Sequence, residues 1–430
     1  MAVKGDSPRH TATYQQRYPV RRALTWVLLV VLIVGGALVG SAWWQERPLG
    51  KAEALLRTGD ARGAIAIINR FLREHRDHGR AYALKACALV EMGDSGAAIR
   101  LFERVGAENA REFHAWAKAL LQQQQWSTAA PLLEHVLEEG VDRADVLHEL
   151  AACRAKLGDY TGALSVAEQF SREPGFEARG NLLVGTIHRE RGNFQRAATA
   201  WDEVLKHDSE AKNLQVAPAD FFLEYGSVLT ALGESERAVD LIQRSLELEI
   251  NAEALIVLGD AWSQRGRAKE AEDAYRRALE LEPGQVDART GLAQLALSQG
   301  DAARALDWLA PLESSNSMTS QTAFLFQRTY ARLSDRDAAE RWRNKADELR
   351  GLERVQEAAN QILQNSPESD WARVIRAYRF AESGNWEEAE HILKPLASAT
   401  RDQPFIQSLI EAVRTRGPIP SLDGLPVKQF

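Results

Sequence analysis

A short sequence pattern recurs along most of this 430-residue chain at a spacing close to 34 residues. In each copy a glycine precedes an alanine-rich amphipathic segment, as in GDYTGALSVAEQF from Gly158 and GRAKEAEDAYRRALELEP from Gly266. From Gly59 the successive spacings are 34, 31, 34, 34, 41, 33, 34, 34 and 50 residues, with Gln124 and Ser334 in two of the glycine positions. Such a chain folds as a stack of similar units, because each unit buries its apolar face against its neighbours.

Each copy predicts a helix, a tight turn and a second helix. Apolar residues three and four positions apart before the turn, such as Leu255, Leu258 and Trp262, indicate an amphipathic helix. Gly266 then supplies the positive φ of a sharp turn. The residues predicted to pack the helices together or to end them are Gly185, Gly226, Gly259, Ala271, Tyr275, Ala278 and Pro283.

Residues 252–285 resemble the tetratricopeptide repeat family. They match the family's Leu-Gly pair, central alanine, aromatic residue and closing pair with Leu258-Gly259, Ala271, Tyr275, Ala278 and Pro283. The resemblance extends over residues 45–398. It implies an all-α fold, a right-handed superhelical solenoid of about ten helix-turn-helix units. The apolar segment described below places this solenoid behind one N-terminal transmembrane helix.

The resemblance also implies a binding surface, since the first helices of this family line a concave groove that holds a protein or peptide. The Lys/Asn/Arg cluster by which chaperone-binding members clamp a terminal carboxylate is missing from the matching positions. The alternative is that the polar residues at the groove positions only face solvent and that the repeats act as a spacer. The groove positions carried over from the family are His148, Thr186, Arg189, Ser227, Asp260, Ser263, Gln264 and Gln294.

The wider spacings and the C-terminal region predict departures from the regular stack. An insertion near residues 209–219 is expected to form a loop or a lengthened helix end. A second insertion near residues 346–369 is expected to form an extended second helix or an additional one. Residues 399–415 predict a helix that caps the stack, and the Pro- and Gly-rich residues 416–430 predict an extended tail.

An apolar segment precedes the repeats at residues 23–44. It contains no charged residue, is long enough to cross a bilayer as a helix, and has Trp26 and Trp43 near its two ends. We interpret it as an uncleaved signal-anchor. A cleavable signal peptide remains the alternative, because Gly40 and Ala42 are small residues at a spacing that a signal peptidase accepts.

Charge predicts the orientation of this segment. Residues 1–22 carry a side-chain charge of +4, whereas the remainder of the chain is acidic and the net charge is −7. The positive-inside rule therefore places the N-terminus in the cytoplasm and the repeats on the outer face of the membrane, in the periplasm if the source is bacterial. Gly36 and Gly40 form a GxxxG motif, which predicts close helix packing and a homo-oligomer as one option.

The composition and the absence of certain motifs exclude several classes of function. The acidic net charge excludes a nucleic-acid footprint, and two cysteines are too few for a disulfide framework or a four-cysteine zinc site. No catalytic, cofactor or metal motif is present, and the repeats leave no room for a separate catalytic domain. The sequence thus predicts a non-enzymatic, membrane-anchored scaffold for protein partners in envelope assembly, secretion or complex biogenesis. A structural, self-associating envelope protein and a regulatory subunit of a membrane enzyme are the alternatives.

Overall fold

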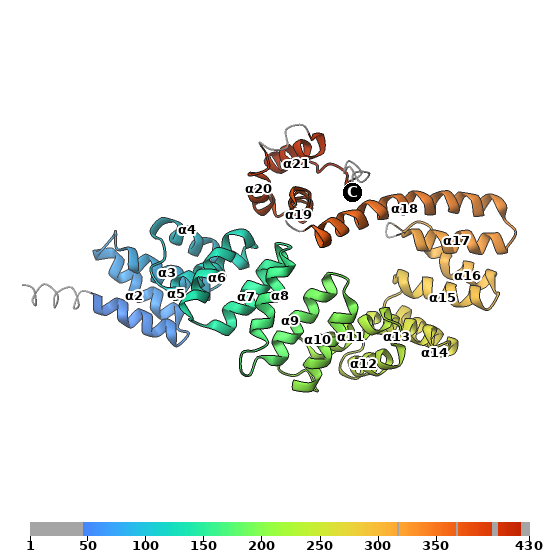
Figure 1. The fold of residues 1–430 in the computed structure, drawn as a ribbon, viewed down its shortest axis with the longest axis horizontal. Helices are drawn as coiled ribbons and strands as arrows, with labels where there is room; N and C mark the ends of the chain where they lie inside the picture. The colour runs from blue at the N-terminus through green and yellow to red at the C-terminus, as the bar shows by residue number, and fades with distance from the viewer. Residues whose placement is uncertain (1–45, 316–317, 367–368, 398–402, 423–430) are drawn as a thin grey trace, which may run out of the picture. The chain divides into compact units, whose positions relative to one another are not determined.

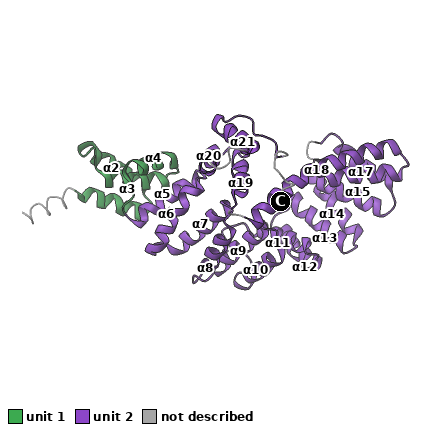
Figure 2. Ribbon diagram, turned by 45° about the horizontal axis from the view of Figure 1, so that its top comes forward, with its two compact units in different colours: residues 1–108 green, residues 109–430 purple. Residues whose placement is uncertain are grey.

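The computed structural model describes residues 46–315, 318–366, 369–397 and 403–422 (Figure 1). Within these residues it contains helices and turns and no β-strand. The chain divides into two compact units, residues 1–108 and 109–430 (Figure 2). The predicted transmembrane segment, with Gly36 and Gly40, lies outside the described residues. Among the helices that are described, none has the length and apolar character needed to cross a membrane.

The described part of the first unit is built from helix pairs. A helix over residues 46–57 packs with the next helices through a small core that contains Leu49, Ile68 and Phe71. Asp60 and Asp94 cap the helices that follow the two turns, each accepting a hydrogen bond from a main-chain N–H three residues later. The remaining helices of this unit are α2 (Ala61–Glu74), α3 (Gly79–Glu91) and α4 (Ser95–Val105).

The second unit continues the same alternation of first and second helices. Its helices are α5 (Ala110–Gln122), α6 (Trp126–Glu139), α7 (Arg143–Lys156), α8 (Tyr160–Phe170), α9 (Glu177–Glu190), α10 (Phe194–His207), α11 (Pro218–Ala231), α12 (Ser235–Leu248), α13 (Ala252–Gln264), α14 (Ala268–Leu281), α15 (Val286–Ser298), α16 (Ala302–Leu309), α17 (Ser320–Arg332), α18 (Arg336–Asn365), α19 (Asp370–Glu382), α20 (Trp386–Leu393) and α21 (Pro404–Thr415).

Helices within the second unit contact one another in a regular order (Figure 1). Each first helix packs against the second helix of its own repeat, and that second helix packs against the first helix of the repeat that follows. First helices of adjacent repeats also contact one another in the pairs α11 and α13, α13 and α15, and α15 and α17. The first helices therefore share one face of the array, which is the arrangement expected of a solenoid.

The turn within each repeat both ends one helix and starts the next. Gly158 adopts a φ of +76°, and the N–H of Asp159 donates to the carbonyl of Arg154, five residues earlier, at 2.9 Å. The Asp159 side chain then accepts a hydrogen bond from the Gly162 N–H at 2.8 Å and caps the next helix. The recurrent Gly-Asp dipeptide therefore satisfies main-chain groups on both sides of the turn.

The two non-glycine turns keep the same backbone conformation. Ser334 has a φ of +65° and Gln124 a φ of +56°. The N–H of Asp335 still donates to the carbonyl of Tyr330, as in the glycine turns. The hydrogen-bond pattern of the repeat therefore holds these residues in a left-handed conformation that side chains disfavour.

Ser334→Gly is expected to raise the free energy of unfolding by about 1 kcal/mol, because glycine adopts this φ without a steric cost. Gly266→Ala is the matched opposite change: Gly266 has a φ of +70° and open space around it, so a loss of similar size is expected. Urea unfolding of the full chain, followed by its helical circular dichroism, measures both. A loss of stability in Ser334→Gly would show that the backbone of Ser334 is not strained in this turn.

Close helix contacts depend on glycines. A Cβ at Gly259 of α13 would lie 2.5 Å from Tyr275 Cε1, and one at Gly291 of α15 would lie 2.5 Å from Tyr275 Cζ. The ring of Tyr275 thus fills the space between two first helices that have no side chain there. At Gly185 a Cβ would meet the indole of Trp201 in the same way, at 2.2 Å.

The two insertions take different forms. Residues 208–217 connect α10 to α11 as a loop, which buries Ala211 and Leu214 against the core of the neighbouring helices. The longer insertion lies in one continuous helix of 30 residues, α18. Near its start Trp342 stacks on Phe326 with ring centroids 4.0 Å apart, and near its end Leu363 joins a separate core with α19. Helix α18 therefore links two hydrophobic clusters.

The last repeat of the second unit contacts an early one. Asn385 Nδ2 donates to the carbonyl of Gln124 at 3.2 Å, and Gln125 Nε2 donates to Glu387 at 3.0 Å. The Ser127 N–H donates to Glu388 Oε1 at 3.3 Å. Helix α20 thereby packs on α6 although they are distant in sequence, while α21 packs on α19 and α20.

Candidate binding groove

A groove of about 780 Å³ lies on the shared face of the first helices in the second half of the array. Its walls come from α11, α13, α15 and α17, with one residue each from α14 and α18. Ser and Thr hydroxyls and Gln amides dominate the lining. The residues that line it are Ser227, Thr230, Ala231, Val257, Asp260, Ser263, Gln264, Tyr275, Asp287, Thr290, Gly291, Gln294, Thr319, Ser320, Gln321, Thr322 and Glu353.

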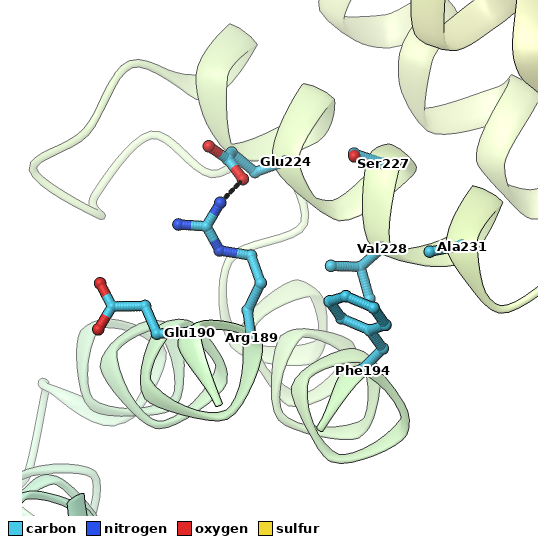
Figure 3. Close-up of a pocket in the computed structure, with 7 residues that line it drawn as sticks. All are labelled: Arg189, Glu190, Phe194, Glu224, Ser227, Val228 and Ala231. Carbon is cyan, nitrogen blue, oxygen red and sulfur yellow. Dashed lines mark hydrogen bonds and ion pairs between the residues drawn. The ribbon is translucent and has the colours of Figure 1, made fainter. Parts of the chain in front are cut away.

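A smaller pocket of about 340 Å³ adjoins this groove at Ser227, which lines both (Figure 3). Arg189 of α9 points toward Glu224 of α11 and forms an ion pair with it. Phe194 and Val228 supply an apolar side opposite that pair. The cation of Arg189 is therefore already neutralised by a residue of the neighbouring first helix.

The structure brings most of the sequence-predicted groove residues together. The five that line the large groove are Ser227, Asp260, Ser263, Gln264 and Gln294, and Arg189 lines the adjoining pocket. Gln264 also has a structural role, because its Nε2 donates to the carbonyl of Thr230 at 3.1 Å and its Oε1 accepts from Ser235 at 2.6 Å. Whether these residues bind a partner stays a prediction.

Two predicted residues lie elsewhere. The His148 ring packs on Phe170, with centroids 5.6 Å apart, and burial and the nearby Arg179 lower its pKa. Thr186 donates its hydroxyl to the carbonyl of Leu182 in its own helix at 2.9 Å. Both side chains are thus partly buried among neighbouring residues and line neither of these two pockets.

Sequence reasoning missed one wall of the groove. The start of α17 contributes a run of hydroxyl and amide side chains, Thr319 to Thr322, and α18 contributes Glu353. Glu353 accepts hydrogen bonds from both the N–H and the hydroxyl of Ser320, which lowers the pKa of its carboxyl group. The polar sequence TSQT at the start of a first helix was the available signal.

The centre of the groove carries negative charge. Tyr275 donates its hydroxyl to Asp260 Oδ1 at 2.6 Å. Asp260 is exposed at its surface, yet desolvation by the groove walls raises its pKa; the hydrogen bond from Tyr275 acts in the opposite direction, and the nearby Asp287 raises the pKa further. None of the described lining residues is Lys or Arg. The groove therefore presents carboxylates without a cation of its own.

The stacked helix pairs and the lined face of first helices define an α-helical repeat protein of the solenoid class. A family model described as Tetratricopeptide repeat matches residues 49–110, 114–173, 183–252 and 226–286, and a second model of that description matches residues 263–319. These matches cover more than half of the chain. The chain belongs to the tetratricopeptide repeat family, whose members bind protein partners.

Curated relatives share the repeats at low identity. Anaphase-promoting complex subunit 7 of Arabidopsis thaliana is 27% identical over 60% of this chain and 45% of its own length. Cellulose synthase operon protein C of Pseudomonas fluorescens is 24% identical over 64% of this chain and 19% of its own length. Lipopolysaccharide assembly protein B of Escherichia coli K12 is 21% identical over 54% of this chain and 64% of its own length. The chain thus spans less than two thirds of each relative.

Proposed function

We propose that this chain is a non-enzymatic scaffold that is anchored in a membrane by residues 23–44 and binds a protein partner in the groove of its repeats. The observation that carries the proposal is the groove itself, because four adjacent first helices direct polar side chains into one continuous space. Gln294 and Gln321 are exposed there on neighbouring helices. A tetratricopeptide groove uses such side chains to hold a peptide.

The location and pathway form the finer part of the proposal. The apolar segment and the basic residues before it support an anchor with a cytoplasmic N-terminus and repeats on the outer face. The names of two relatives refer to lipopolysaccharide assembly and to a cellulose synthase operon. These names support a role in envelope assembly, secretion or complex biogenesis.

Photo-crosslinking from within the groove tests this function. A photoreactive amino acid replaces Gln294 of α15 in the full-length chain, and in a control it replaces Arg277, an exposed residue of the second helix α14. We expect one recurrent foreign protein from position 294 in the membrane fraction and none from position 277. Removal of residues 1–44 is expected to shift the array out of that fraction.

Three outcomes would contradict the proposal. Equal products from both positions would mean that the groove has no special role. Absence of any foreign product from position 294 would remove the scaffold function. Products between copies of this chain alone, lost when residues 1–44 are removed, would establish the rival function of a self-associating envelope protein.

A further inference from the structure

We propose that the groove takes an extended peptide segment that carries Lys or Arg side chains. This inference rests on the proposed function and names the chemistry of its partner. The site is the cavity lined by α11, α13, α15, α17 and α18, and its lining decides both the conformation and the charge of the occupant.

The conformation follows from the polarity of the walls. An amphipathic helix docks by laying an apolar face into a hydrophobic groove, whereas an extended chain needs partners for its main-chain N–H and C=O groups. The aliphatic side chains in this lining are those of Ala231 and Val257, and hydroxyls and amides make up most of the remainder. The groove therefore matches an extended chain and not the apolar face of a helix.

Equivalent positions repeat along the groove. Ser227, Asp260 and Gln294 occupy the same register in three successive first helices, each directly after the small residue that packs on the second helix. Packed helices lie about 8–10 Å apart, and an extended chain advances about 3.3 Å per residue. One repeat therefore corresponds to about three peptide residues, and four first helices to about nine.

The charge of the occupant follows from a contrast within the second unit. In the earlier repeats, carboxylates of one first helix meet cations of the preceding one. Glu149 of α7 lies 3.8 Å from Lys118 of α5, and Glu224 of α11 pairs with Arg189 of α9. Within these earlier repeats a carboxylate of one first helix is thus paired with a cation of the preceding first helix.

The described lining of the groove lacks that pairing. Asp260, Asp287 and Glu353 bring three carboxylates to one cavity, and no Lys or Arg is among its described lining residues. The hydrogen bonds from Ser320 lower the pKa of Glu353 and keep its carboxylate charged. Negative charge held in a concave, partly desolvated site attracts a cation and repels an acidic segment. Lys and Arg side chains on the bound peptide provide the missing charge.

Peptide binding to the full-length chain in detergent tests the inference. The ligand is a fluorescein-labelled nine-residue peptide of alternating Ser and Lys, compared by fluorescence anisotropy with the same peptide carrying Glu or Gln in place of Lys. We expect the Lys peptide to bind most tightly and the Glu peptide least. The affinity for the Lys peptide is expected to fall as salt is raised.

Two double variants distinguish peptide binding by the groove carboxylates from attraction by the net negative charge of the chain. Asp260→Asn with Asp287→Asn keeps an acceptor for Tyr275 and is expected to weaken Lys-peptide binding about fivefold. Asp273→Asn with Glu280→Gln makes the same change in net charge at exposed positions of α14 and is expected to leave binding unchanged. Equal losses in both double variants, or equal binding of the Lys and Glu peptides, would overturn the inference.

Crosslinking distinguishes this failure from failure of the proposed function. The photoreactive residue at position 294 is combined with the Asp260→Asn and Asp287→Asn changes. Loss of the foreign product supports a cationic segment. Capture of the same partner at full yield would overturn the charge inference and leave the scaffold function standing, whereas no product in the parent chain would remove the scaffold function itself.

Discussion

Gly259→Leu is expected to lower the free energy of unfolding of the repeat array by about 1 to 3 kcal/mol. A Cβ at this position already lies 2.5 Å from Cε1 and 2.7 Å from Cδ1 of Tyr275, and leucine adds three further carbon atoms. The ring has no room to retreat, because a Cβ at Gly291 on its other side would be equally close. Its hydroxyl is also held by Asp260. Urea unfolding of the full chain measures the loss.

Gly351→Leu is the matched control for this substitution. Gly351 lies within the long helix α18, is exposed, and would place a Cβ in open space. There leucine improves helix propensity, so a gain of up to about 1 kcal/mol is expected. Equal effects of the two substitutions would show that helix propensity and not the Tyr275 contact determines the outcome. An unchanged stability in Gly259→Leu would mean that Tyr275 does not pack closely against Gly259 of α13 in solution.

The repeat pattern predicted the local architecture because its determinants lie close together in sequence. A glycine that stops one helix stands beside the Asp or Asn that starts the next, as at Gly158 and Asp159. Small residues such as Gly185 and Gly259 stand at the positions where a bulky side chain approaches. Each of these signals acts within one repeat or between adjacent repeats, so the periodicity alone was sufficient to find them.

The groove was predictable in part for the same reason. Ser227, Asp260 and Gln294 follow the packing glycine or alanine in their repeats, and that register faces the groove. Thr186 follows Gly185 in the same register, but it lies in α9, and none of the residues that line the large groove belongs to that helix. The register also failed to include Glu353, which lies in the inserted part of α18 and has no counterpart in a regular 34-residue unit.

The contact between α20 and α6 was beyond sequence reasoning. In an ideal solenoid each repeat touches only its neighbours, so nothing in the period pairs the last repeat with an early one. The contact nevertheless buries Glu388 to 1% exposure. The Glu388 carboxyl group lies near the thiol of Cys153. This thiol donates to the carbonyl of Trp126, and its pKa is raised to about 12, mainly by burial. The buried carboxyl group of Glu388 therefore makes the stability of the array depend on pH.

Glu388→Gln is expected to stabilise the array at neutral pH and to remove one pH-dependent component of its stability. Burial raises the pKa of Glu388 above its ordinary value of 4.5, whereas the hydrogen bonds from Ser127 and the nearby His391 act in the opposite direction. Below about pH 4.5 the group is protonated in both folded and unfolded chains, and its contribution to stability is fully present. As pH rises through the folded-state pKa, that contribution is lost, because ionisation is easier in the unfolded chain.

Thermal unfolding of the full chain at a series of pH values between 4.5 and 8 measures this effect. The midpoint of Glu388→Gln is expected to exceed that of the parent chain by an amount that grows with pH and then levels off. The glutamine keeps an oxygen acceptor for the Ser127 N–H, so the α6 to α20 contact stays intact. Glu390→Gln is the control, since this carboxylate is exposed on the same helix. A constant difference across the series, or the same trend in both variants, would show that Glu388 is not buried against α6 in solution and that the last repeat stands apart from the early one.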